Sequence, residues 1–115
     1  MPIFIRGDDI EYGLRNCKRL VTQNGICVWH EPFESKYSSS MYYYILRNQC
    51  IDNSMHCPGY DANALKADLR SQVMGEVNRY RYKNADLLIR GVRDFLKGID
   101  WLEQTDAEAL HKEIM

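Results

Sequence analysis

The pattern of hydrophobic and polar positions changes near residue 36. Before this point, short apolar runs alternate with turn residues. After it, apolar residues recur at intervals of three and four, which is typical of amphipathic helices. The pattern therefore divides the chain into a mixed N-terminal region, residues 1–36, and a helical C-terminal region, residues 37–115.

The N-terminal region predicts one strand, one short helix and one hairpin. The apolar run at residues 2–5 predicts the strand. Residues 8–19 predict the helix, which Asp8 would cap because its side-chain oxygen can accept from a free backbone N–H. Asn24-Gly25 lies between the β-prone runs LVTQ and ICVWH, and this arrangement is a strong hairpin signal. A two-stranded piece is marginally stable alone, so we expect these strands to extend a larger sheet.

The C-terminal region predicts a helical unit. The helical stretches are residues 37–57, 60–82, 84–98 and 105–115. The pattern as a whole predicts an α+β fold that is predominantly helical. In this fold a short N-terminal strand and a β-hairpin are followed by three or four helices.

Local signals mark the helix ends in this region. Asp61 is placed to cap the second stretch, and Gly98 follows the third as a C-terminal signal. Thr105 and Glu108, three residues apart, match a capping box at the start of the last stretch. Leu65 begins a stripe of apolar residues that recurs every four residues through the second stretch, either as a packing face or as a surface that docks a partner.

Composition and charge exclude several classes of protein. The chain has 115 residues and a net charge of −1, so it fits one domain and has no basic surplus that would suggest a nucleic-acid surface. No apolar run approaches the ~20 residues that cross a bilayer. The N-terminus lacks the apolar core of a signal peptide. We therefore expect a cytoplasmic protein, at most associated with the inner face of a membrane.

The four cysteines show no C-x-x-C pair, and free thiols are expected in a cytoplasmic protein. Cys27 and His30, together with His56-Cys57, could be combined into a zinc site. Structural zinc sites usually show tightly paired spacing, which this set lacks.

Three carboxylates gather at the start of the first predicted helix: Asp8, Asp9 and Glu11. One interpretation is ordinary capping, because acids in a first turn interact favourably with the helix dipole. The other is catalysis, because adjacent carboxylates repel and crowding raises the pKa of one of them toward a useful range. The residues alone leave both interpretations open, and composition favours capping.

Trp29-His30 ends the second run of the predicted hairpin. A histidine at a strand end can be a metal ligand or an acid/base group, because its neutral imidazole is available near pH 7. The commoner alternative is a half-buried histidine bonded to the backbone. Trp29 is either a core residue or a platform for the apolar face of a sugar ring.

These motifs together resemble a known family. The segment DDIEYGLR at residues 8–15, WH at residues 29–30 and YYYILRN at residues 42–48 are similar to the later half of the catalytic domain of inverting family 2 glycosyltransferases. Within this family the similarity is greatest to the galactofuranosyltransferase-like group, which extends bacterial polysaccharides. The resemblance covers residues 2–57 in detail and continues more loosely to residue 115.

The resemblance implies roles for five residues. Asp9, the second acid of the pair, would be the general base that deprotonates the acceptor hydroxyl. Asp8 would lie beside it and bind acceptor hydroxyls or tune the base. Trp29 and Glu11 would contribute to the acceptor site. His30 would be a ligand of the divalent metal ion that holds the donor's diphosphate.

The resemblance also implies a cofactor and partners. The metal would be Mn²⁺ or Mg²⁺, and it needs the ligands of a D-x-D motif that this sequence does not contain. That motif belongs to an earlier, nucleotide-binding half of such enzymes. We therefore expect a C-terminal fragment, inactive when isolated, whose complete protein uses a UDP-sugar donor and a glycan or glycolipid acceptor. Arg47 and Asn48 match an RN pair of the family and have no assigned role.

A different class of function remains as an alternative. The amphipathic stretches of residues 60–115 could form a non-catalytic module that binds a partner or associates with a second copy of the chain. The two interpretations are compatible, because such helices could also mediate homo-oligomer contacts in an enzyme.

Overall fold

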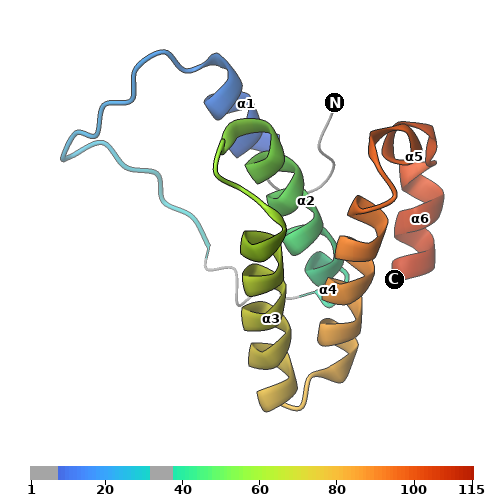
Figure 1. Cartoon of the computed structure of the whole chain (residues 1–115). Coiled ribbons are helices and arrows are strands. Elements are labelled where there is room, and N and C mark those ends of the chain that lie inside the picture. Colours follow the sequence, from blue (N-terminus) through green and yellow to red (C-terminus); the bar gives the residue numbers. More distant parts are fainter. Residues whose placement is uncertain (1–7, 32–37) are drawn as a thin grey trace.

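The computed structural model describes residues 8–31 and 38–115. Within these ranges the chain forms helices and a projecting irregular segment (Figure 1). The helices are α1 (Asp8–Asn16), α2 (Met41–His56), α3 (Ala62–Asn78), α4 (Tyr82–Phe95), α5 (Ile99–Gln104) and α6 (Ala107–Ile114). No helix in the described ranges combines the length and the apolar character needed to cross a bilayer.

The centre of the core lies where α2, α3 and α4 meet. Leu46 and Cys50 of α2 pack against Leu88 and Val92 of α4, and all four side chains are buried. Burying one such aliphatic side chain stabilises a fold by about 1.5–3 kcal/mol. The stripe that begins at Leu65 on α3 packs against this cluster. Leu65, Leu69 and Val73 of this stripe are therefore packed, though only partly buried, within the chain.

A second cluster joins the two ends of the helical region. Tyr43 and Tyr44 of α2 pack with Leu87 of α4 and with Leu110 and Ile114 of α6. The hydroxyl of Tyr44 also lies 3.0 Å from Nδ1 of His111 on α6. This cluster fixes the C-terminal helix against the centre of the unit.

A glycine allows α2 and α4 to approach closely. A Cβ atom added at Gly91 would clash with the backbone carbonyl oxygen of Tyr43 and would lie 3.4 Å from Cβ of Arg47. Because Gly91 is buried in the middle of α4, the helices could accept a side chain only by moving apart. This position therefore sets the distance between the two central helices.

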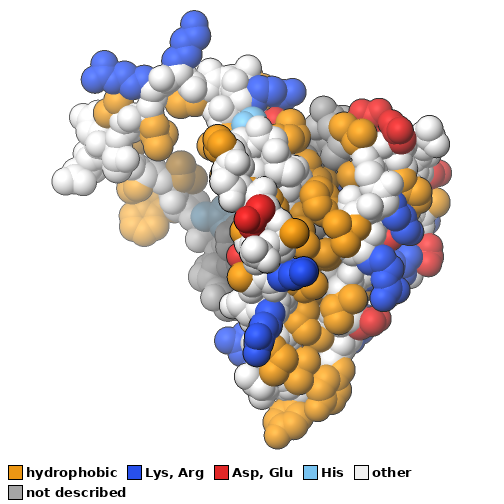
Figure 2. Space-filling view, in the orientation of Figure 1, with side chains coloured by type: hydrophobic (Ala, Val, Ile, Leu, Met, Phe, Trp, Pro, Cys, Tyr) orange, Lys and Arg blue, Asp and Glu red, His pale blue; other side chains and the backbone are white. Residues whose placement is uncertain are grey.

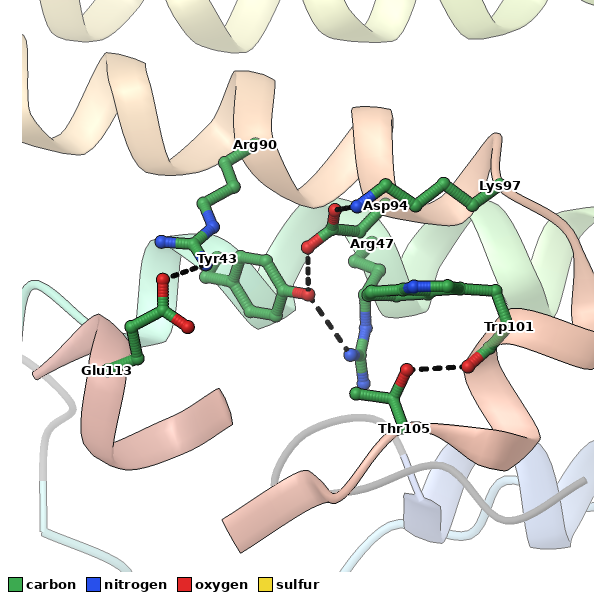
Figure 3. Close-up of polar contacts among 8 residues, drawn as sticks. All are labelled: Tyr43, Arg47, Arg90, Asp94, Lys97, Trp101, Thr105 and Glu113. Atoms are coloured by element: carbon green, nitrogen blue, oxygen red, sulfur yellow. Dashed lines mark hydrogen bonds and ion pairs between the residues drawn. The ribbon is translucent and has the colours of Figure 1, made fainter. Parts of the chain in front are cut away.

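A series of hydrogen bonds and an ion pair connects α2 with α4 (Figure 3). The hydroxyl of Tyr43 donates to Asp94 at 2.7 Å and accepts from Nη1 of Arg47 at 3.4 Å. Lys97 pairs with the other carboxylate oxygen of Asp94 at 2.8 Å. Burial raises the pKa of the Tyr43 phenol, and its hydrogen bond to Asp94 raises it further. The phenol therefore keeps its proton and links α2 to α4.

The helix ends confirm one cap prediction and correct another. The side chain of Asp61 accepts from the backbone N–H of Ala64, as the cap prediction requires. At α6 the cap is Asp106, whose Oδ1 accepts from two backbone N–H groups, and not Thr105. The hydroxyl of Thr105 instead donates to the carbonyl oxygen of Trp101 at 2.6 Å, because the preceding helix α5 ends there. The sequence pattern did not predict α5.

The predicted α+β class is wrong for the described part of the chain, which contains no strand. The turn at Asn24-Gly25 is present, and Gly25 has a φ of 87°, but the flanking runs do not pair. These runs expose their large apolar side chains on the projecting segment (Figure 2). A hairpin that buries so little surface lacks stabilisation. The strand predicted at residues 2–5 lies outside the described residues. The helix predicted at residues 8–19 is present as α1, but it ends at Asn16.

Candidate functional site

Asp9 lies in the first turn of α1 and its side chain is exposed. Its Oδ1 accepts a hydrogen bond from the backbone N–H of Ile10 at 2.9 Å. This geometry holds the carboxylate at the end of the helix in contact with solvent, where a substrate hydroxyl could reach it. Asp8 begins α1, and its side chain lies outside the described part of the structure, so its role stays a prediction.

Glu11 lies on the opposite side of α1 and is almost completely buried, with 4% of its surface exposed. Its Oε1 is 3.4 Å from Nε2 of His56, at the end of α2, and its Oε2 is 3.5 Å from Nη2 of Arg15. The structure therefore places Glu11 against α2. The predicted role of Glu11 in acceptor binding stays a prediction.

Asp52 completes this contact between α1 and α2. Burial raises the pKa of the Asp52 carboxyl above its ordinary value, and the negative charge of Glu11 raises it further, while His56 lowers it. Among the residues that the structure describes, Oε1 of Glu11, Oδ1 of Asp52 and Nε2 of His56 are buried without a hydrogen-bond partner. The interface between α1 and α2 thus buries polar atoms whose hydrogen bonding is incomplete among the described residues.

Trp29 and His30 lie on the irregular segment that projects from the helical unit (Figure 1). The Trp29 side chain is 93% exposed. Nδ1 of His30 donates to the backbone carbonyl oxygen of Glu31 at 2.6 Å. The structure therefore presents both side chains to solvent and does not assemble them with Asp9 into one pocket.

The described residues do not fit a metal centre. Across residues 8–31 and 38–115, no three His, Cys, Asp or Glu side chains are grouped closely enough to hold a metal ion. One imidazole cannot bind Mn²⁺ or Mg²⁺ firmly, because these ions need several oxygen-rich ligands. The role of His30 as a metal ligand stays a prediction, and the zinc combination of Cys27, His30, His56 and Cys57 is not assembled.

A cavity that sequence patterns did not reveal lies between α4 and the α5–α6 pair. Its volume is about 570 Å³, and its lining mixes acidic and basic side chains. Nη2 of Arg90 donates a hydrogen bond across the cavity to Oε1 of Glu113 at 2.8 Å (Figure 3). Nζ of Lys97 lies 4.3 Å from the centre of the Trp101 ring. The charges are largely paired with one another.

Arg47 and Asn48 have a structural position that the sequence did not indicate. Both are buried in α2, and Nε of Arg47 donates to the side-chain oxygen of Asn48 at 3.1 Å. The Arg47 guanidinium also lies 5.1 Å from the centres of the Tyr43 and Tyr44 rings. The pair therefore contributes to the polar packing between α2 and α4.

Comparison with known proteins finds two similar curated sequences. The galactofuranosyltransferase GlfT2 of Mycobacterium tuberculosis is 30% identical to the chain over 110 residues, and that of Mycolicibacterium smegmatis is 27% identical over 103 residues. Each alignment covers 85% of this chain, which spans only 16% of the length of each relative. No family model and no solved structure matches the chain. The chain thus resembles part of a galactofuranosyltransferase.

Proposed function

We propose that this chain supplies the general base and part of the acceptor site of an inverting glycosyltransferase that transfers galactofuranosyl or related hexosyl units. One observation carries the proposal: the similarity to galactofuranosyltransferases extends over 85% of the chain. The exposed position of Asp9 is compatible with a group that meets a substrate.

The proposed reaction is a single displacement at the anomeric carbon of the donor sugar. The Asp9 carboxylate takes the proton of an acceptor hydroxyl as that oxygen attacks the anomeric carbon. The new glycosidic C–O bond forms while the bond from the anomeric carbon to the phosphate oxygen breaks. The nucleoside diphosphate leaves with that electron pair, and the configuration inverts. General-base assistance of this kind contributes about 10²–10⁴-fold to the rate.

The proposed partners follow from the same chemistry. The donor is a UDP-sugar, and the acceptor is a glycan or a glycolipid of a bacterial cell-surface polysaccharide. Trp29 would offer the face of its indole to the apolar side of an acceptor sugar, since its ring is exposed to solvent. We place the reaction in the cytoplasm or at the inner face of the membrane.

The direct test is a transfer assay on the polypeptide as its gene encodes it. The polypeptide is incubated with UDP-galactofuranose and a short galactofuranoside acceptor. UDP release is measured with and without the acceptor, and NMR determines the configuration of the new linkage. We expect acceptor-dependent UDP release and a product whose anomeric configuration is opposite to that of the donor.

Two outcomes would contradict the proposal. One is a polypeptide that releases no UDP in the presence of the acceptor, which would remove glycosyl transfer as the function. The other is a product that retains the donor's configuration, because retention is incompatible with a single displacement assisted by one base.

A further inference from the structure

Helix α1 packs against the other helices with a polar residue and leaves its apolar residues exposed. Its apolar residues Ile10, Tyr12 and Leu14 are 54–64% exposed, whereas Glu11 is only 4% exposed. An amphipathic helix normally buries its apolar face. Burying a carboxylate is costly unless it is paired, so a specific partner must hold this helix in place.

The partner is His56 in the last turn of α2. Its Nε2 lies 3.4 Å from the buried Oε1 of Glu11, and 20% of the His56 side chain is exposed. The charged groups that face this contact are Arg15 on α1 and Asp52, one turn earlier on α2. Arg15 is half-exposed, and pairs of that kind contribute little. Among the residues that the structure describes, the contact between Glu11 and His56 is therefore the main specific link between the two helices.

This link also fixes the direction in which Asp9 points. Successive residues of an α-helix are rotated by about 100°, so residues two apart lie on nearly opposite faces. Asp9 is two residues before Glu11 and is exposed, whereas Glu11 is buried against α2. If α1 rolled about its axis, Glu11 would leave His56 and Asp9 would turn away from its present direction.

We propose that His56 is a positioning residue, which holds Glu11 and thereby orients the general base Asp9 toward the acceptor. The role of Asp9 in this inference rests on the proposed function. The contact itself does not, because it is a property of the folded chain. The two parts can therefore be tested separately.

The first experiment measures amide hydrogen exchange by NMR in the chain itself. His56→Gln removes the imidazole but keeps a polar side chain of similar length. We expect exchange of the hydrogen-bonded amides of residues 12–17 to become at least 10-fold faster, while amides of α4 stay unchanged. Arg15→Gln is the matched control and should change exchange in α1 by less than 2-fold. If His56→Gln also changes it by less than 2-fold, the contact does not hold α1 and the proposal is overturned.

The second experiment measures transfer by the polypeptide as its gene encodes it. We expect His56→Gln to lower kcat at least 10-fold while the KM for the donor stays within 2-fold. Adding Glu11→Gln to His56→Gln should cause no further loss, because both changes break the same contact. Faster exchange in α1 with an unchanged kcat would overturn the positioning role. Normal transfer by Asp9→Asn would overturn the proposed function, and the exchange experiment would still decide whether the contact holds α1.

Discussion

The two described regions of the molecule treat similar side chains in opposite ways. Helices α2 to α4 bury Leu46, Leu88 and Val92 almost completely. Residues 17–31 carry comparable apolar side chains, yet Val28 is 88% exposed and Trp29 is 93% exposed. The difference shows that hydrophobic composition does not by itself make a core. The apolar face of one element has to pack against the apolar face of another. Within the described residues, only the helical region achieves this.

The comparison also separates stability from chemistry. The helical region contains the two hydrophobic clusters and the buried hydrogen bond from Tyr43 to Asp94. These contacts hold the fold together. The residues proposed for catalysis and acceptor binding, Asp9 on α1 and Trp29 in residues 17–31, are exposed and lie outside these clusters. Binding residues are often found on exposed segments that a rigid scaffold supports. Substitutions in the two regions should therefore have different consequences.

The largest expected difference is between Leu46→Ala and Val28→Ala. Leu46 is fully buried, so its truncation should lower the free energy of unfolding by about 2–5 kcal/mol. Val28→Ala should change it by less than about 0.5 kcal/mol, because its side chain meets solvent. Urea unfolding followed by circular dichroism measures both. Equal effects of the two substitutions would refute the contrast between the regions.

The next effect concerns the closest approach in the helical region. Gly91→Ala should destabilise the protein by about 1–3 kcal/mol, because the new Cβ clashes with the Tyr43 carbonyl oxygen. Gly75→Ala in α3 is the matched control, since its Cβ would meet nothing within 4 Å. This control should stabilise the protein by about 0.4–1 kcal/mol. Thermal unfolding of both variants tests the prediction, and a stabilised Gly91→Ala variant would show that α2 and α4 are not in close contact.

A smaller effect should come from the cap of α3. Asp61→Ala leaves the backbone N–H of Ala64 without its side-chain acceptor and should cost about 1 kcal/mol. Asp61→Asn keeps an acceptor at the same place and should be nearly neutral. The free energies of unfolding of the two variants decide the matter. A loss in both would mean that the charge of Asp61, and not its hydrogen bond, stabilises the helix.

The smallest effect is a pH dependence of stability at the contact between α1 and α2. Burial and Glu11 raise the pKa of Asp52 in the folded state, so its contribution to stability is present below about pH 4 and is lost as the pH rises through the raised value. Asp52→Asn should therefore stabilise the protein at pH 7 by less than about 1 kcal/mol and have little effect near pH 4. Unfolding in urea at both pH values measures this. Destabilisation by Asp52→Asn at pH 7 would show that Asp52 mainly supports His56.

The sequence predicted local helices well, because their signals are local. Asp61 caps α3 as expected, and Pro58-Gly59 follows the end of α2 at His56. The hairpin around Asn24-Gly25 was predicted from equally local signals and is wrong. A strand needs neighbours that sequence spacing does not reveal, and this segment has none among the described residues. The cap at Thr105 failed for a similar reason, because the unpredicted helix α5 uses its hydroxyl.

The candidate site could be predicted only in part. The acids at the start of α1 and the WH pair were visible as motifs, and their proposed roles stay predictions. The resemblance of the chain to galactofuranosyltransferases agrees with the comparisons. The burial of Glu11 was not visible, because its partner His56 lies 45 positions further along the chain and is brought near only by packing. The structural position of Arg47 was hidden for the same reason.

The most direct test of the central claim is a parallel measurement on Asp9→Asn of the transfer rate and of the unfolding temperature. Asp100→Asn is the matched control, because Asp100 is an exposed acid in the first turn of α5. We predict that Asp9→Asn lowers the transfer rate by at least about 100-fold and shifts the unfolding temperature by less than about 2 °C, while Asp100→Asn leaves the transfer rate unchanged. A transfer rate for Asp9→Asn within 2-fold of the unsubstituted protein would contradict the account.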